Sequence, residues 1–243
     1  MNKKLLAAVL LSALLGACAT TAPGNDIPVQ TGTLAAAADH VGKQIRAAEQ
    51  NIIAYYNADS ELVDKPMRGG YYRVLLGRNA QGQAVIQDFY QDSQTKQINA
   101  VVLPDDNELK NFDVSVTEGR TIWYTPEGRI TNFTDIHNGK SQRSGYYDEQ
   151  GRLALGIEGD LGGDKWLMNG YGENGKLLFA VRNSGGQVAR TYYHDNGQKL
   201  LQEEQNNLQY WKADGSTATA EEVGELVSQT LSRSEYLTRK YLR

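Results

Sequence analysis

Hydrophobic and polar positions divide the chain into an apolar start, two amphipathic ends and a long central region of short alternating segments. After the first apolar run, residues 5–15, seven positions recur at steps of four and three: Leu34, Ala38, Val41, Ile45, Ala48, Ile52 and Tyr55. This spacing places them on one face of a helix, so the pattern predicts an amphipathic N-terminal helix over residues 34–58. The stripe could pack on the domain's own sheet or pair with another chain in a coiled coil, although two alanines and Gly42 weaken the second alternative.

A second amphipathic helix is predicted at the end of the chain, over residues 219–243. Thr219 with Glu222 three positions later forms a capping box, which starts a helix. The apolar stripe consists of Val223, Leu226, Val227, Leu231 and Leu237. Arg239, Lys240 and Arg243 lie in the last turns, where the helix dipole favours cations. We expect this helix to cover the last edge of a sheet.

Between the helices, residues 71–216 show a repeating pattern of an aromatic residue followed four positions later by glycine. The aromatic members are Tyr124, Tyr147, Tyr171, Tyr193 and Trp211, and the glycines are Gly128, Gly151, Gly175, Gly197 and Gly215. A degenerate earlier copy runs from Arg78 to Gly82. Asn-Gly and Asp-Gly supply the positive φ angles of a hairpin turn. The pattern therefore predicts a mainly β fold: an antiparallel β-meander of tandem hairpin repeats, flanked by the two helices, in which neighbouring units stack.

These repeats resemble the MORN-variant repeats of the YwqK-type antitoxin family, whose units carry a Tyr-x-x-x-Gly-(Lys/Arg/Gln) core. The resemblance covers residues 124–216, less than half of the chain. The Gly-x-Gly signature of regular MORN repeats is missing, so lipid-headgroup binding is not carried over.

The first residues indicate export and lipidation. Lys3 and Lys4 precede the apolar run, which is too short to span a membrane, and Leu15-Gly16-Ala17-Cys18 follows. This resembles the lipobox of bacterial lipoproteins. It implies a signal peptide over residues 1–17, a lipidated (palmitate-bearing) Cys18 and, over residues 18–33, a flexible tether broken by Pro23 and Pro28. The alternative is an ordinary signal peptide with a chance cysteine.

Composition narrows the location and the partners. Ala19 follows the cysteine where aspartate would favour inner-membrane retention, so the lipoprotein resemblance implies the outer membrane, on either the periplasmic or the cell-surface side. The chain has 29 acidic and 25 basic residues, and losing Lys3 and Lys4 makes the excess of acids larger. An acidic balance argues against nucleic acid as a partner.

Adjacent aromatic residues recur along the predicted strands, where neighbouring side chains point to opposite faces. The second member of each pair is the repeated one, and we assign it to the packed face. The first members, Trp123, Tyr146, Tyr192 and Tyr210, are then candidates for an exposed face that binds a partner protein or a sugar. Alternatively, they stack across strands and under the flanking helices.

Nothing in the sequence singles out a catalytic group, a cofactor or a metal site. His40, His137 and His194 share no metal-ligand spacing, and the chain has no Gly-x-Ser-x-Gly or Walker motif. Acidic turns at residues 105–108 and 160–164 lack the full spacing of a calcium loop. The expectation is a non-enzymatic protein-binding module, in its more specific version an immunity or antitoxin-like protein. The alternative is a structural or host-facing envelope protein.

Overall fold

The computed structural model describes residues 44–113, 116 and 118–242, and in this part of the chain the protein consists of two antiparallel sheets and one long helix. The five-stranded sheet has the order β2-β1-β3-β4-β5. Its strands are β1 (Ala47–Tyr56), β2 (Leu62–Val63), β3 (Tyr71–Arg78), β4 (Ala84–Tyr90) and β5 (Val101–Val102). A short 3-10 helix, η1 (Asp106–Lys110), follows β5.

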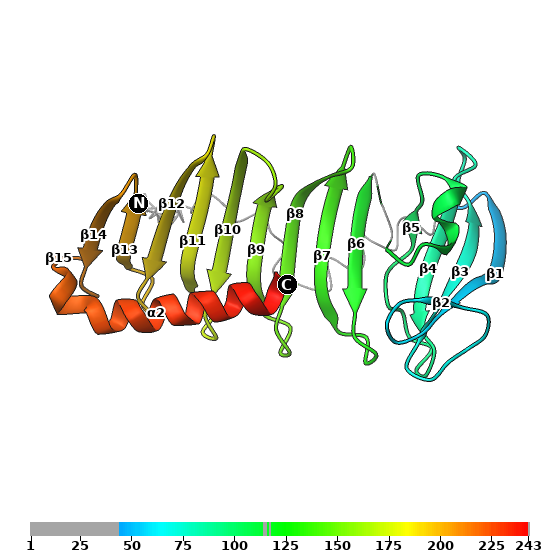
Figure 1. The fold of residues 1–243 in the computed structure, drawn as a ribbon, viewed down its shortest axis with the longest axis horizontal. Coiled ribbons are helices and arrows are strands. Elements are labelled where there is room, and N and C mark those ends of the chain that lie inside the picture. Colours follow the sequence, from blue (N-terminus) through cyan, green and yellow to red (C-terminus); the bar gives the residue numbers. More distant parts are fainter. Residues whose placement is uncertain (1–43, 114–115, 117, 243) are drawn as a thin grey trace, which may run out of the picture.

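The ten-stranded sheet is an uninterrupted meander, in which each strand pairs with the next one along the chain (Figure 1). Its strands are β6 (Gly119–Tyr124), β7 (Ile130–His137), β8 (Lys140–Tyr147), β9 (Leu153–Gly159), β10 (Lys165–Tyr171), β11 (Leu177–Ser184), β12 (Gln187–Tyr193), β13 (Lys199–Glu204), β14 (Asn207–Trp211) and β15 (Thr217–Ala218). The prediction of a mainly β fold built from consecutive antiparallel hairpins is confirmed.

The predicted glycine turns form one end of the meander. Each turn is closed by two backbone hydrogen bonds that involve the residue after the aromatic. In the second repeat this residue is Asp148: its N–H donates to the Arg152 carbonyl (2.9 Å), and its carbonyl accepts from the Gly151 N–H (3.0 Å). The other four repeat turns have the same two bonds. The five repeat glycines have φ between +72° and +92°, the left-handed region that favours glycine. The same two hydrogen bonds occur at residues 79–83 and again at 57–61, where Ser60 takes the glycine position with φ +68°.

The other end of the meander contains two-residue hairpin turns with positive φ at both central positions. They are Asn138-Gly139, Gly185-Gly186 and Gln205-Asn206. These turns have the twist that antiparallel strands require. These turns alternate with the glycine turns, except between β9 and β10, where residues 160–164 form a longer loop.

A β-bulge follows most repeat turns. Tyr192 pairs with Leu201 and Tyr193 with Lys199, so Leu200 is the extra residue in the returning strand. The same irregularity lies at Leu178 in β11. Both residues of each bulge pack in the same cluster: Leu200 with Leu201, and Leu178 with Phe179. The bulge therefore lets two consecutive apolar residues enter one core, which strict alternation would prevent.

Residues 97–99 join the two sheets. The backbone N–H of Tyr124 donates to the Gln97 carbonyl (2.9 Å), and Asn99 N–H donates to Ile122 (3.2 Å). The buried side chain of Asn99 accepts from Ile122 N–H (2.6 Å) and donates to the carbonyls of Ala100 (2.8 Å) and Arg120 (2.9 Å). Strand β6 is thereby hydrogen-bonded to the five-stranded sheet as well as to β7.

The helix α2 (Ala220–Tyr241) lies across one face of the large sheet and contacts β9 to β14 (Figure 1). The predicted capping box is present, with Thr219 and Glu222 bonded in both directions. Val223 is buried against the sheet, and Val227 and Leu237 pack beside it. Two members of the predicted stripe, Leu226 and Leu231, are instead 40% and 38% exposed.

Small polar residues take the central contact positions of α2. Thr230 and Ser234 are buried, and each satisfies its hydroxyl within the helix, by donating to Leu226 (2.8 Å) and Leu231 (2.8 Å) carbonyls. Small side chains are needed there because the sheet below presents bulky aromatic residues. The helix thus covers a face of the sheet, in contrast to the prediction that it covers the last edge.

The predicted N-terminal helix over residues 34–58 is wrong in its second half, because Ala47–Tyr56 forms strand β1. The end of β1 has a two-residue period: Ala54 and Tyr56 are buried, while Ile52 is 51% exposed. A segment rich in isoleucine and tyrosine favours a strand when a neighbour can pair with it, and β3 does so. The first half of the predicted helix, the signal peptide, Cys18 and the tether lie outside the described residues.

Candidate functional site

The first members of the aromatic pairs lie in one row that crosses the large sheet. Register pairs link Trp123 to Asn132, then Tyr146, Leu155, Gly170, Phe179, Tyr192, Leu201 and Tyr210. All of these side chains therefore belong to the same face, which is also the face that α2 covers. The four aromatic residues thus share one face, but α2 covers most of that face, which was predicted to be open.

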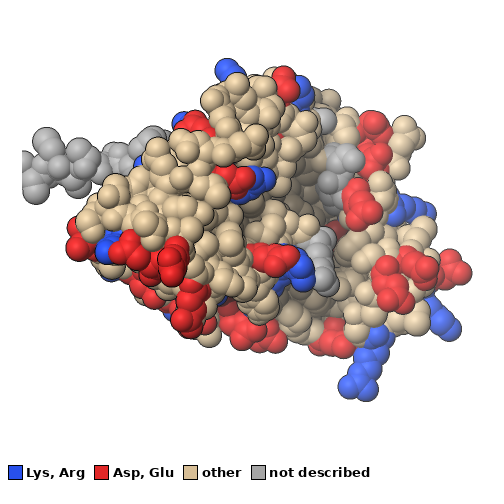
Figure 2. Space-filling model, turned by 60° about the vertical axis from the view of Figure 1, so that its left-hand side comes forward, with Lys and Arg blue, Asp and Glu red and all other residues tan. Residues whose placement is uncertain are grey.

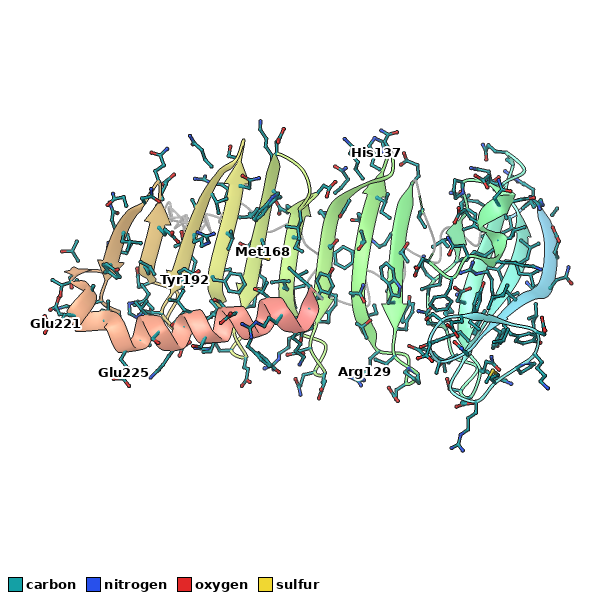
Figure 3. The ribbon with its side chains drawn as sticks, viewed as in Figure 1. Arg129, His137, Met168, Tyr192, Glu221 and Glu225 are labelled. Atoms are coloured by element: carbon teal, nitrogen blue, oxygen red, sulfur yellow. The ribbon has the colours of Figure 1, made fainter. Side chains whose placement is uncertain are left out.

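Three of the four candidate binding residues pack in the core beneath α2. Tyr192 is buried, and Tyr146 and Tyr210 pack against the same cluster as Val223. Figure 3 shows Tyr192 and Met168 beside the helix. The Tyr146 and Tyr241 ring centres are 6.1 Å apart. For Tyr146, Tyr192 and Tyr210 the structure thus shows stacking under a flanking helix, the alternative that the sequence left open.

The second members of the pairs point to the opposite face. Tyr147 is buried with Ile122, Phe133 and Leu153, and Tyr124 and Tyr171 pack against this second cluster. Burial raises the pKa of Tyr147 to about 12. Farther along the sheet, Tyr193 and Trp211 are only half-buried, and the Lys199 ammonium lies 5.5 Å from the Trp211 ring centre. No helix among the described residues covers this face.

A charged row crosses the same face near its first strands. Arg120 pairs with Asp135, and Arg143 also donates to Asp135 (2.9 Å). These residues occupy neighbouring strands in register. The alternation of positive and negative side chains makes this part of the face self-paired, so it leaves no free charge for a ligand.

Trp123 is placed differently from the other first members. It lies beyond the end of α2 and packs on the core of the small sheet. There it lines a cleft of about 280 Å³ at the junction of the two sheets. The other lining residues are Asp88, Gln97, Ile98, Phe112, Asp113 and Thr121. Trp123 is thus a candidate binding residue that lines a concave surface.

A buried ion pair forms one wall of the junction cleft. The guanidinium of Arg73 donates two hydrogen bonds of 2.7 Å to the two carboxylate oxygens of Asp88, and both residues are buried. Arg73 also donates to the Asn111 carbonyl (2.5 Å), and its guanidinium carbon lies 5.5 Å from the Tyr56 ring centre. Burial raises the pKa of Tyr56 to about 12, and its hydroxyl has no hydrogen-bond partner among the residues that the structure describes. The pair holds η1 and the segment after it against β3 and β4.

Sequence reasoning missed this buried pair, although a signal was present. Arg73 and Asp88 are charged residues in the interior of largely apolar strands, which is unusual unless the charges meet. Only the register, in which Arg73 faces Asp88, shows that they do.

The histidines that the structure describes have structural surroundings. His137 lies in a hairpin turn, with Nδ1 2.9 Å from a Glu118 carboxylate oxygen (Figure 3). His194 is buried in a repeat turn, with Nε2 2.9 Å from the Trp211 carbonyl. His40 lies outside the described residues. Across residues 44–113, 116 and 118–242, no group of three or more His, Cys, Asp and Glu side chains could hold a metal ion.

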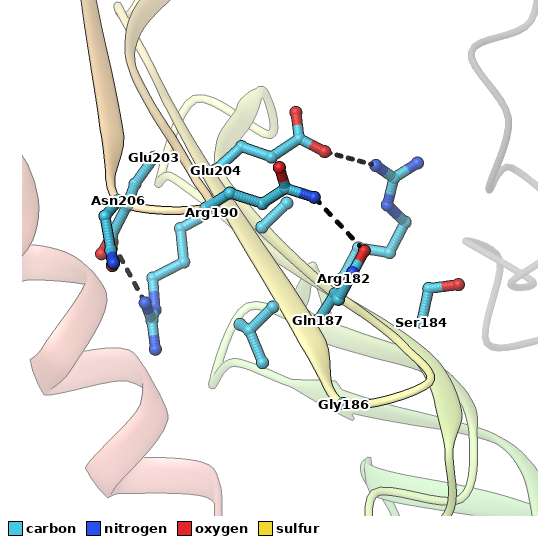
Figure 4. A pocket seen from close by; sticks show the side chains of 11 residues that line it. Arg182, Ser184, Gly186, Gln187, Arg190, Glu203, Glu204 and Asn206 are labelled. Carbon is cyan, nitrogen blue, oxygen red and sulfur yellow. Dashed lines mark hydrogen bonds and ion pairs between the residues drawn. The ribbon is translucent and has the colours of Figure 1, made fainter.

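A second hollow of about 290 Å³ lies at the hairpin-turn end of β11 to β14 (Figure 4). Its charged side chains are already paired, Arg190 with Glu203 (3.0 Å) and Arg182 with Glu204 (3.7 Å). Gln205 also donates to Gln187 (3.5 Å). Because the polar groups satisfy one another, this hollow is a weaker candidate than the junction cleft.

Comparison with known proteins adds no family assignment. No family model matches the chain, and no curated protein matches its sequence. None of the helices in the described part of the chain is long and apolar enough to cross a membrane.

Proposed function

We propose that this protein is a lipid-anchored, non-catalytic module of the bacterial envelope that binds another protein. One observation carries the proposal: α2 covers one face of the large sheet, while Tyr171, Tyr193 and Trp211 lie half-buried on the opposite face. They occupy alternate strands β10, β12 and β14. Strand spacing separates neighbours in this row by roughly 10 Å, because each lies two strands from the next.

The composition of this face suits contact with a protein. Tyrosine and tryptophan bury a large area at low conformational cost and are enriched among residues that dominate binding energy. The next row of the same face contains Asn169, Ala180, Thr191 and Gln202, which are short or neutral. A hydrogen-bonded sheet also holds the aromatic side chains in fixed positions, which lowers the entropy lost on binding.

The anchor and the location rest on the lipobox resemblance. Lipidation of Cys18 would tether the domain to the outer membrane through the segment before β1. Protease treatment of intact cells tests the side: cleavage of the domain while a periplasmic control survives indicates the cell surface, and protection until the outer membrane is opened indicates the periplasm.

The more specific form of the proposal is an immunity or antitoxin-like protein, and it rests on the resemblance to the YwqK-type family. A fold does not determine a function, so this form needs its own test. Cells that lack the gene should lose viability beside toxin-producing siblings. If they remain fully resistant, the immunity form is wrong and the alternative, a structural or host-facing envelope protein, is favoured.

Site-directed photocrosslinking in living cells tests the binding face itself. A crosslinking residue at the exposed Gln209 of β14 should give one defined adduct, and the double variant Tyr193→Ser/Trp211→Ser should remove it. A crosslinking residue at Ser228, exposed on α2, is the matched control. Equal adducts at both positions, or an adduct that survives the double variant, would show that this face is not the contact surface.

A further inference from the structure

We propose that the cleft at the junction of the two sheets binds a neutral, hydroxyl-rich sugar ring of a glycan, with Trp123 as the stacking platform and Gln97 and Thr121 as hydrogen-bonding groups. This site lies on the face of the sheet that carries α2, beyond the end of the helix. It is therefore separate from the protein-binding face proposed above, and either proposal can fail without the other.

Unpartnered polar groups in the cleft carry the inference. Thr121 is only 3% exposed and lines the cleft, yet its hydroxyl makes no hydrogen bond to any described residue. The side-chain amide of Gln97 and the indole N–H of Trp123 likewise have no partner in the described part of the chain. Thr121 is the buried member of this group, whereas Gln97 and Trp123 are half-buried, so their polar atoms can be reached from the cleft by a ligand that forms hydrogen bonds.

The types of these groups match hydroxyls. An amide offers donors and an acceptor, a threonine hydroxyl does both, and an indole only donates. A sugar hydroxyl is also both a donor and an acceptor, so each group can pair with one. The face of Trp123 supplies an apolar platform for the C–H side of a pyranose ring, and Phe112 adds a second aromatic residue to the lining.

Charge in the cleft argues against an ionic ligand. Both oxygens of Asp88 already accept from Arg73, so this carboxylate is neutralised. Among the described residues that line the cleft there is no lysine or arginine, which leaves an anion without a counter-charge there. Asp113 is an exposed carboxylate at the rim, where solvent screens its attraction for a cation and where it can accept hydrogen bonds from hydroxyls.

The dimensions agree with a short saccharide segment. A volume of about 280 Å³ lies near the lower limit for small-molecule sites, which is roughly 300 Å³. The face continues along the same row to Asn132 and Tyr146, two strands from Trp123. A longer glycan can therefore extend across β7 and β8 toward the end of α2.

Isothermal titration calorimetry with the full chain, purified in a polyoxyethylene detergent that carries no sugar, tests the site with a readout that does not depend on Trp123 itself. Chitotetraose and maltotetraose are the probes, and at least one should give a saturable heat of binding. Trp123→Phe should weaken binding by at least about tenfold, and Thr121→Val and Gln97→Ala by about three- to tenfold each. Tyr236→Phe, at an exposed aromatic residue of α2, is the control and should leave affinity unchanged.

Three outcomes would overturn the proposal. The first is that neither saccharide binds at concentrations up to about 10 mM, since a Kd above that value is weaker than ordinary recognition. The second is that the affinity of Thr121→Val and of Gln97→Ala equals that of the unaltered chain. This comparison can be made even if Trp123→Phe fails to fold. The third is that choline binds and neither saccharide does, with an affinity that depends on Trp123, which would make the cleft a site for organic cations.

Discussion

At the residue scale, glycines on one strand of the sheet lie opposite large aromatic residues on the neighbouring strand. In the third repeat, glycine replaces the first aromatic member, at Gly170, and its register partner is Phe179. A Cβ at Gly170 would lie 1.9 Å from the Phe179 ring. Gly145 and Phe133 form an equivalent pair, with a distance of 2.5 Å. The missing aromatic in the repeat pattern is thus supplied by the next strand.

We expect Gly170→Ala to destabilise the protein by about 1–3 kcal/mol, because the added methyl group displaces the buried Phe179 ring. Urea unfolding measures the change. Gly224→Ala is the matched control, since a Cβ there meets nothing within 4 Å and the position lies in α2. The control should stabilise by about 0.5–1 kcal/mol, because alanine has the higher helix propensity. Equal effects of the two variants would contradict the packing argument.

Tyr56 links stability to alkaline pH. Its pKa is about 12 in the folded chain against 10.0 for a free side chain, because burial disfavours the phenolate. The folded state therefore keeps its proton longer than the unfolded state. The stabilisation is complete below pH 10 and is lost as the pH rises from 10 to 12, on the order of 2–3 kcal/mol.

Tyr56→Phe tests this dependence. The variant should unfold with a shallower loss of free energy between pH 10 and 12, and it should be at least as stable at pH 7, because the hydroxyl is buried without a partner. Tyr236→Phe, at a tyrosine that is 62% exposed, should leave the pH profile unchanged. A large loss of stability at pH 7 in Tyr56→Phe would show that the hydroxyl is bonded after all.

At the element scale, the sheet and α2 depend on each other. The helix is short of apolar residues on its own, and the cluster under it, including Leu155, Phe179 and Leu200, would be open to water without it. Fully burying one such side chain contributes about 1.5–3 kcal/mol. Bulges at the repeat turns increase the number of side chains that the helix covers. The helix start is therefore a point where a small local change affects the whole face.

Thr219→Ala should lower the unfolding free energy by about 0.5–2 kcal/mol, because it removes the side-chain acceptor for the Glu222 N–H. Chemical unfolding followed by circular dichroism measures it. Ser228→Ala, at an exposed position in the middle of α2, is the control and should be neutral or slightly stabilising. If both substitutions act alike, the cap is not holding the helix start.

At the scale of the whole molecule, the two sheets are one hydrogen-bonded structure because residues 97–99 pair with β6. Turn residues add a second link along the chain. Arg129, at the turn end of the sheet in Figure 3, donates to the Glu149 carbonyl (2.8 Å), and Asn196 donates to the Ala213 carbonyl (2.7 Å). The repeats therefore contact mainly their neighbours, as in other serial folds.

Acidic side chains outnumber basic ones over the surface that Figure 2 shows.

Asn99→Ala should weaken the joint between the sheets. The substitution leaves the Ile122 N–H and the Ala100 and Arg120 carbonyls without this partner, at a cost of about 1–3 kcal/mol for each buried group that finds no other. We expect calorimetric unfolding to separate into two transitions. Asn207→Ala, at an exposed asparagine in β14, should keep the shape of the wild-type transition. A single, unshifted transition in Asn99→Ala would contradict a joint held by this side chain.

The sequence by itself determined the local structure of the repeats. Glycine at positions with positive φ, the aromatic residue before each turn and the Thr219–Glu222 capping box act through neighbours within a few residues. Such local preferences need no knowledge of the fold, so the meander, its turns and the C-terminal helix could be predicted. The common face of Trp123, Tyr146, Tyr192 and Tyr210 followed from alternation for the same reason.

Only the tertiary structure decided which face is covered and where the clefts lie. The spacing at residues 47–56 fits a helix as well as a strand, and β3 as a pairing partner selects the strand. The path of the chain after β15 decides which face α2 covers, the face of Tyr146 and Tyr192 or the opposite face of Tyr147 and Tyr193. Likewise, strand register brings Arg73 and Asp88 together. The meeting of the two sheets brings together Gln97, Thr121 and Trp123. Contacts between residues far apart in sequence carry no local signal, and the candidate sites of this protein consist of such contacts.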